Sequence, residues 1–263
     1  AYEITYGDWS SDVCSSDLPA SHALDNIVTV GASNNFDFVS AFSNYGAAVD
    51  IFAPGESIIS LNYASNILGT INPIKQMVAM LKAAGVITYV DAVQFAPHGA
   101  VDVQDLGCDF LVASAYKFYG PHQGILFGRR EVTEPLDAYK LRVVPNQIPD
   151  KYETGTQSLE GQAGVLGAIE YMRWYASEFA GSHVAAEKAA GRNDRTAHIH
   201  GAMHAMVDYE QTLSRRLIEG LHTIPGVKVH GITDPAAFDR RVPTVSITHP
   251  SLAPAAAATY LGE

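Results

Sequence analysis

Two residues that could do chemistry follow the two most apolar strand-like runs of the sequence. Asp91 comes directly after the run Val86–Val90, and Lys117 follows the run Phe110–Ser114. Continuous apolar, β-branched runs are typical of parallel strands covered on both faces, and open α/β sheets bind ligands at the carboxyl ends of their strands. A carboxylate and an amine at one sheet edge could bind such a ligand. Taken as an arbitrary pair, however, Asp91 is better interpreted as a turn cap and Lys117 as a solvated lysine.

The residues around these runs predict helices that would cover the sheet. Asn72 before Pro73 is typical of a helix start. Apolar side chains recur at helical spacing over Ile74–Leu81, and Gly85 closes the element. Another helix is predicted to run to about Gly220. Alternating helices and strands predict an α/β fold.

The composition is that of a globular protein with one large or two ordinary domains. The chain has 263 residues, of which 47% are hydrophobic and 17% charged. Its formal net charge of −11 argues against a nucleic-acid surface, and no run is long and apolar enough to span a membrane. No secretion signal follows Ala1, and two cysteines, Cys14 and Cys108, cannot form a disulfide framework. We therefore expect a cytoplasmic protein without nucleic-acid or membrane partners.

The first residues differ in character from the rest. Residues 8–18 read Asp-Trp-Ser-Ser-Asp-Val-Cys-Ser-Ser-Asp-Leu, which has neither helical nor strand periodicity. This stretch resembles, letter for letter, the translation of a sequencing-adapter oligonucleotide. We therefore interpret residues 1–18 as an artefactual leader outside the fold, and Cys14 as a residue without a functional role.

Residues 19–60 read as strand, turn and strand, with apolar runs at Ile27–Val30 and Val49–Phe52. Three stretches resemble the subtilisin-like serine proteases: Leu24–Ala32, Phe42–Gly46 and Val49–Gly55. That chemistry needs a serine nucleophile, a base and an oxyanion hole. The family's nucleophile motif, Gly-Thr-Ser-Met-Ala, does not occur in this sequence. A protease is therefore the weakest functional alternative, and Asp25, Asp37 and Asp50 are interpreted as turn or cap residues.

Four further motifs occur in order after residue 61: Ser65–Pro73, Val90–His98, Ser114–Pro121 and Glu153–Thr156. Together they resemble the class V aminotransferases, the fold-type-I pyridoxal phosphate enzymes that include the cysteine desulfurases. The resemblance implies an incomplete large domain with a mainly parallel sheet over residues 61–200. It also implies the start of a small C-terminal α+β domain over residues 201–263, with its opening strands in Ile224–His230 and Pro243–Thr248.

The same resemblance assigns roles around pyridoxal 5'-phosphate. Lys117 is the expected residue that forms an imine with the cofactor, and partial burial would lower the pKa of its amine enough for that. Asp91 would keep the pyridine nitrogen protonated, so that the ring accepts electrons from the substrate α-carbon. The other implied contacts are Gln94 near the ring hydroxyl, Asn66 near that hydroxyl or the substrate carboxylate, Ser114 and Tyr116 near the phosphate, and Thr156 at the phosphate of a neighbouring subunit. The implied protein is a homodimer that acts on an amino acid.

Other reactive residue types receive structural interpretations. His198, His200 and His204 form His-x-His-x-x-x-His, but no cysteine or carboxylate completes a recognisable zinc spacing, so no metal is expected. Cys108 begins an apolar strand and is expected to be a small buried hydrophobe. His98 is expected to pack or hydrogen-bond rather than to catalyse.

The sequence departs from the family pattern, and these departures leave a second interpretation of its function open. The family's phosphate turn and cofactor-stacking aromatic ring normally precede the asparagine loop, and neither is found before Ser65. The sequence also ends at Glu263, before the family's substrate arginine and desulfurase cysteine. We therefore expect a truncated, chimeric chain whose parts join near Ser60. If it is not an active enzyme, the alternative is a non-catalytic chimeric fragment.

Overall fold

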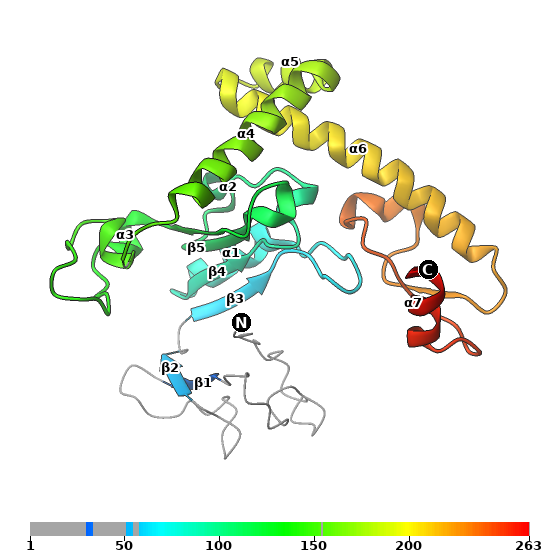
Figure 1. Cartoon of the computed structure of the whole chain (residues 1–263), viewed down its shortest axis with the longest axis horizontal. Helices are drawn as coiled ribbons and strands as arrows, with labels where there is room; N and C mark the ends of the chain where they lie inside the picture. The colour runs from blue at the N-terminus through cyan, green and yellow to red at the C-terminus, as the bar shows by residue number, and fades with distance from the viewer. Residues whose placement is uncertain (1–29, 34–50, 55–57, 154, 263) are drawn as a thin grey trace. The chain divides into compact units, whose positions relative to one another are not determined.

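The computed structural model describes residues 30–33, 51–54, 58–153 and 155–262 (Figure 1). The chain divides into two units, one comprising Ala1–Ile59 with Lys82–Ile87 and the other Ser60–Leu81 with Thr88–Glu263. The predicted leader, with Cys14, lies outside the described residues, as do Asp25, Asp37 and Asp50.

A two-stranded sheet lies in the first unit. Strand β1 (Val30–Ser33) pairs in parallel with β2 (Ile51–Pro54), and Val30 lies opposite Ile51. The described strands overlap the predicted apolar runs at Val30 and at Ile51–Phe52. The subtilisin-like origin of this segment stays a prediction.

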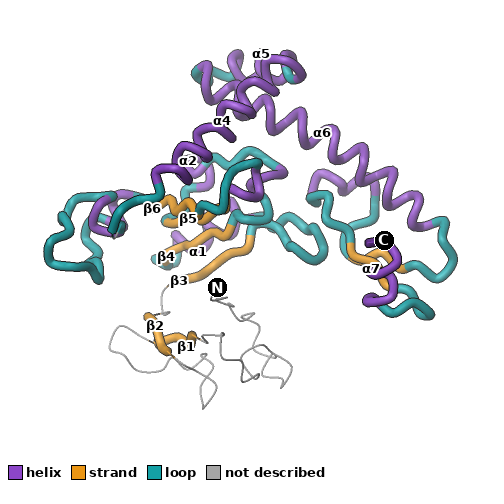
Figure 2. Tube along the Cα trace, in the orientation of Figure 1, coloured by secondary structure: helices purple, strands orange, loops and turns teal. Residues whose placement is uncertain are grey.

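A four-stranded sheet carries the edge at which a ligand site was predicted (Figure 2). Its strand order is β3 (Ile58–Asn62), β4 (Ile87–Asp91), β5 (Phe110–Ser114) and β6 (Gly124–Gly128). Strands β4 and β5 are parallel, with Asp91 opposite Val112, whereas β6 is antiparallel to β5. The predicted strand Phe110–Ser114 is found with the same bounds, and the α/β class is confirmed. The junction predicted near Ser60 falls within β3.

One core cluster joins this sheet to helix α1 (Ile74–Ala83). The helix buries Ile74 and Val78, each 1% exposed, which confirms the predicted amphipathic face. The sequence predicts that Asn72 caps this helix. Its side-chain nitrogen instead donates a hydrogen bond to the Asn62 carbonyl at 2.7 Å. The remaining members of the cluster are Leu61, Val90, Ala92, Leu106, Cys108 and Leu111. The prediction that Cys108 is buried is therefore confirmed.

Short helical segments connect the strands. They are η2 (Ala96–His98), α2 (Val103–Leu106), η3 (Ala115–Phe118), α3 (Arg130–Thr133) and η4 (Asp150–Tyr152). Helix α2 begins at Asp102, whose side chain accepts hydrogen bonds from the amides of Gln104 and Asp105. Such an N-cap satisfies amides that have no partner within the helix.

Three longer helices pack on one another through small and flexible side chains. They are α4 (Leu159–Phe179), α5 (Gly181–Ala189) and α6 (Asp194–His222). Their shared core consists of Met172, Ala176, Ala180, Val184, Ala197, Ala202, Met203 and Met206. The 29 residues of α6 make a helix about 44 Å long, and the domain boundary predicted at residue 200 falls inside it.

The C-terminal region contains the two strands predicted there. Strand β7 (Lys228–His230) pairs antiparallel with β8 (Ser246–Thr248), after which α7 (Pro254–Gly262) follows. The segment η5 (Pro235–Arg240) lies between the strands. Of the helices that the structure describes, none combines the length and the apolar character needed to cross a bilayer.

Candidate functional site

The parallel pairing of β4 and β5 brings the predicted site residues to one sheet edge. Asp91 ends β4 opposite Val112, and Ser114 ends β5 two residues further along the same direction. Segment η3 begins immediately after Ser114, so Tyr116 and Lys117 also follow this edge. The carboxylate, the amine and the hydroxyl groups therefore lie where α/β sheets bind ligands.

Asp91 is half-buried and held by its own turn. Its Oδ1 accepts a hydrogen bond from the Val93 amide at 2.9 Å, and its carbonyl accepts one from the Tyr63 amide at 2.9 Å. The turn-cap interpretation of Asp91 is therefore correct. A cap bond to one oxygen fixes the carboxylate at the strand end and is compatible with a second partner for the other oxygen.

Lys117 is exposed, which differs from the expected partial burial. Its Nζ lies 5.3 Å from the centroid of the Tyr116 ring, a cation–π distance. The Tyr116 ring in turn stacks on His122, with centroids 5.3 Å apart. Lys117 lies in η3, past the end of β5, where the described side chains do not cover it. An amine in this position is accessible to a ligand.

The loops carrying Asn66 and Gln94 meet at Thr244. The side-chain nitrogen of Gln94 donates to Thr244 Oγ1 at 3.0 Å. Gly69, with φ of +73°, lies in the Asn66 turn and has no side chain. A Cβ added there would lie only 2.6 Å from the Thr244 carbonyl oxygen, so glycine allows the turn to approach this segment. Asn66 itself is exposed. The structure thus brings these two loops together through a residue that sequence analysis did not single out.

Thr156 is exposed and precedes α4. Ser158 caps this helix by accepting a hydrogen bond from the Gly161 amide at 3.2 Å. The first half of α4 packs against the loop after η3, since a Cβ added at Gly164 would lie 2.8 Å from Pro121 Cγ. This packing connects the Thr156 segment to the loop that follows Lys117.

His98 contacts a carboxylate of α6. Its Nδ1 lies 3.0 Å from both carboxylate oxygens of Glu210 on α6. The two residues line a small cleft together with Val207, Gln211, Ser214, Phe238, Arg241, Val242 and Pro243. Buried Arg241 donates to the Thr244 carbonyl at 2.6 Å, and burial lowers the pKa of its guanidinium. His98, Glu210 and Arg241 thus already have hydrogen-bond partners within the fold, which favours the strand edge as the candidate site.

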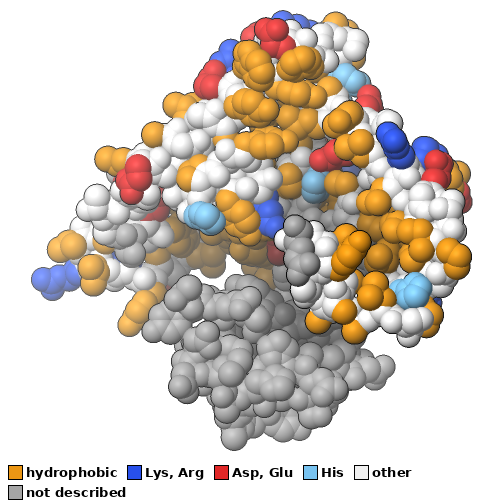
Figure 3. Space-filling view, turned by 45° about the vertical axis from the view of Figure 1, so that its right-hand side comes forward, with side chains coloured by type: hydrophobic (Ala, Val, Ile, Leu, Met, Phe, Trp, Pro, Cys, Tyr) orange, Lys and Arg blue, Asp and Glu red, His pale blue; other side chains and the backbone are white. Residues whose placement is uncertain are grey.

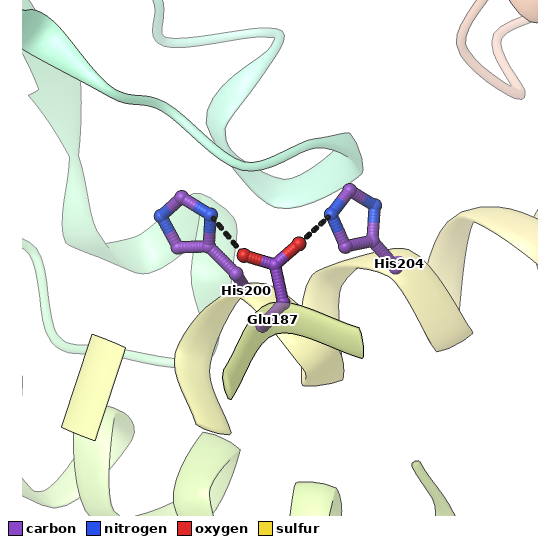
Figure 4. A group of neighbouring side chains, drawn as sticks. All are labelled: Glu187, His200 and His204. Carbon is purple, nitrogen blue, oxygen red and sulfur yellow. Dashed lines mark ion pairs between the residues drawn. The ribbon is translucent and has the colours of Figure 1, made fainter. Parts of the chain in front are cut away.

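The three histidines of the His-x-His-x-x-x-His motif separate into two groups. His198 Nδ1 hydrogen-bonds to the Asp194 carbonyl one turn earlier, at 2.7 Å. His200 and His204 face Glu187 of α5, each toward a different carboxylate oxygen (Figure 4). Burial is the largest cause that lowers the pKa of His200, with a further contribution from the nearby Arg192 charge. Burial therefore favours the neutral form of the His200 ring.

Sequence reasoning missed three partners of the residues it singled out: Glu187, Glu210 and Thr244. Thr244 lies 150 residues from Gln94, and Glu210 lies 112 residues from His98. Glu187 precedes His200 but belongs to a different helix. Residues this far apart or on separate helices share no local periodicity, so no signal in the sequence pairs them.

Comparison with known proteins shows one family. The model of the aminotransferase class-V family matches residues 45–193, more than half of the chain. The match begins inside the segment interpreted as subtilisin-like. A cysteine desulfurase of Pectobacterium atrosepticum is 30% identical over 187 residues, covering 66% of this chain and 40% of that protein. The aminotransferase-like protein FGM3 of Gibberella zeae is 33% identical over 195 residues, covering 73% of this chain and 42% of that protein.

Solved structures with the same fold include two cysteine desulfurases. The enzyme from Thermococcus onnurineus NA1, in its apo form, has a TM-score of 0.57 and 23% identity, and the match covers 78% of this chain and 47% of that one. The Escherichia coli enzyme CsdA gives a TM-score of 0.57 with 22% identity. The chain spans less than half the length of these relatives. By its sequence match and its fold, the chain belongs to the aminotransferase class-V family.

Proposed function

We propose that the chain is part of a pyridoxal phosphate-dependent enzyme that acts on an amino acid as a homodimer in the cytoplasm. One observation carries the proposal: Asp91 ends β4 and Lys117 follows its parallel neighbour β5, at the same sheet edge. The donor set at this edge fits the cofactor, because it combines a fixed carboxylate, an accessible amine and hydroxyl groups. When bound, pyridoxal phosphate supplies an electron-accepting ring for reactions at the α-carbon of an amino acid.

Each residue of the edge has a separate task in this proposal. The Lys117 amine would hold the cofactor by condensing with its aldehyde group, with loss of water. The Asp91 carboxylate holds a proton at the pyridine nitrogen, and its bond from the Val93 amide keeps it oriented. Ser114 and Tyr116 offer hydroxyl groups to the phosphate. Gln94 and Asn66, on the loops joined through Thr244, orient the ring hydroxyl or the substrate carboxylate.

The test locates the cofactor on the protein. Full-length chain is mixed with pyridoxal phosphate, its visible absorbance is recorded, and borohydride reduction followed by peptide mass spectrometry identifies the labelled lysine. We expect the label on Lys117, and its loss together with the protein-bound absorbance in Lys117→Ala. Lys75→Ala is the matched control, because Lys75 is an exposed lysine whose Nζ pairs with Asp105 at 2.5 Å. It should label like the unaltered chain.

The competing proposal is a non-catalytic member of the family, formed by joining unrelated segments near Ser60. The exposure of Lys117 favours it. Folded chain that shows no absorbance change, or that is labelled equally at several lysines, would contradict the enzyme proposal and support this one.

A further inference from the structure

We propose that Glu187, His200 and His204 bind one divalent metal ion of the zinc class, at a site on α5 and α6 that is separate from the residues of the strand edge. The His-x-His-x-x-x-His motif alone predicts no metal, because no cysteine or carboxylate lies at a recognisable zinc spacing in the sequence. The tertiary structure supplies that carboxylate from the neighbouring helix. The proposal is independent of pyridoxal phosphate.

Helical geometry explains why the two histidines act together. His200 and His204 are four residues apart on α6, a spacing that places side chains on the same helix face. Two histidines at this spacing on one face form a recurrent zinc-binding pair. Gly201 lets α5 approach this face, since a Cβ there would lie 2.9 Å from the Val184 backbone nitrogen. Glu187, one helical turn after Val184, thereby reaches the histidine pair.

The distances suit a small tetrahedral ion. His200 Nδ1 lies 3.5 Å from Glu187 Oε2, and His204 Nε2 lies 3.2 Å from Glu187 Oε1. Zinc with nitrogen and oxygen ligands in tetrahedral geometry separates neighbouring ligand atoms by about 3.3 Å. The ligand atoms of all three residues lie within 4.8 Å of one another. The three ligand atoms therefore lie near the spacing that one such ion requires.

Burial leaves one side of the cluster open. The side chains of Glu187 and His200 are 17% and 11% exposed, whereas that of His204 is 47% exposed. Three protein ligands with an open fourth position are typical of zinc sites that also hold water. Glu187 Oε2 is buried and, among the described residues, accepts no hydrogen bond that would occupy it. Ion pairs, rather than hydrogen bonds, therefore hold Glu187 Oε2, and a metal ion could replace them.

The positive charge of Arg192 would repel a cation at this position. Its Nε lies 2.7 Å from Glu187 Oε2, without hydrogen-bond geometry, and its Nη1 donates to Asp102 at 3.1 Å. The Asp102 bond can keep the guanidinium paired when a metal takes the glutamate. Because a fixed positive charge repels the ion, Arg192→Gln should bind zinc more tightly than the unaltered chain.

The experiment measures zinc binding to untagged, full-length chain by isothermal titration, with cobalt(II) absorbance as the report of ligand geometry. We expect one ion per chain. Glu187→Gln and His204→Gln should each weaken zinc binding at least about tenfold. His198→Gln is the matched control, because His198 lies on the same helix but bonds to the Asp194 carbonyl. It should leave the affinity unchanged.

These measurements distinguish a metal site from a cluster that is held together only by ion pairs. Far-UV circular dichroism checks that each variant keeps its helices, and His204→Gln changes a half-exposed ring that the fold tolerates. Absence of zinc binding at micromolar concentration would overturn the proposal. So would equal weakening by His198→Gln, which would indicate non-specific histidine binding, or an unaltered affinity in Glu187→Gln.

Discussion

Asp109 is a buried carboxylate that joins β4, β5 and the segment after β6. Its Oδ2 accepts hydrogen bonds from the Thr88 amide at 2.8 Å and the Thr88 hydroxyl at 3.0 Å, and its Oδ1 accepts one from Arg129. Asp109 is 3% exposed and Thr88 is fully buried. A buried charge of this kind is tolerated only because each oxygen has partners.

Replacing Asp109 with alanine should lower the free energy of unfolding by about 3–5 kcal/mol, because the buried Thr88 donors and Arg129 lose their acceptor. Urea denaturation at neutral pH measures the change. Glu131→Ala is the control, since Glu131 is 77% exposed and lies 3.9 Å from Arg129 Nε. It should change stability by less than about 1 kcal/mol. A similar small effect for Asp109→Ala would show that the network does not stabilise the sheet.

At the scale of elements, the contact between α5 and α6 depends on a residue without a side chain. Gly201 faces Val184, and an added Cβ would lie 2.7 Å from Val184 Cγ2 and 2.9 Å from its backbone nitrogen. The side-chain methyl could move, but the backbone could not without separating the helices. The same close approach sets the position of Glu187 relative to the histidine pair.

Gly201→Ala should therefore lower the free energy of unfolding by about 1–3 kcal/mol, and it should also weaken zinc binding. Gly167→Ala provides a control of opposite sign. Gly167 lies within α4, and among the described residues nothing lies within 4 Å of an added Cβ. Alanine there should raise stability by about 0.5–1 kcal/mol. Thermal unfolding of the two variants tests both signs, and stabilisation by Gly201→Ala would contradict the close approach.

At the scale of the whole molecule, the proposed enzyme needs a second copy of the chain. Thr156 is exposed in its own chain, in the segment before α4. If it contacts the cofactor phosphate of a neighbouring subunit, cofactor affinity and dimer formation are linked, because ligand binding stabilises the form that binds it.

We expect the chain to sediment at twice the mass of one copy in the presence of pyridoxal phosphate. Thr156→Ala should weaken cofactor affinity by about tenfold, the equivalent of about 1.4 kcal/mol. Thr212→Ala is the control, because the Thr212 hydroxyl donates to the Asp208 carbonyl within α6. If cofactor affinity is independent of protein concentration and Thr156→Ala has no effect on it, the proposed contact between Thr156 and the cofactor is contradicted.

The sequence by itself determined the local features of this protein. The apolar run Phe110–Ser114 becomes β5 with the same bounds, the periodic side chains Ile74 and Val78 become the buried face of α1, and Asp91 ends a strand. These features depend on neighbouring residues, whose periodicity and turn chemistry are readable along the chain. The motifs that indicate the family are likewise contiguous stretches.

Only the tertiary structure decided which distant side chains meet. It pairs Gln94 with Thr244, places Glu187 between His200 and His204, and leaves Lys117 exposed where partial burial was expected. Such contacts depend on helix packing and on which loops lie beside a strand end. Packing is set by the shapes of many side chains at once, as the glycine contact at Val184 illustrates. No local pattern contains that information.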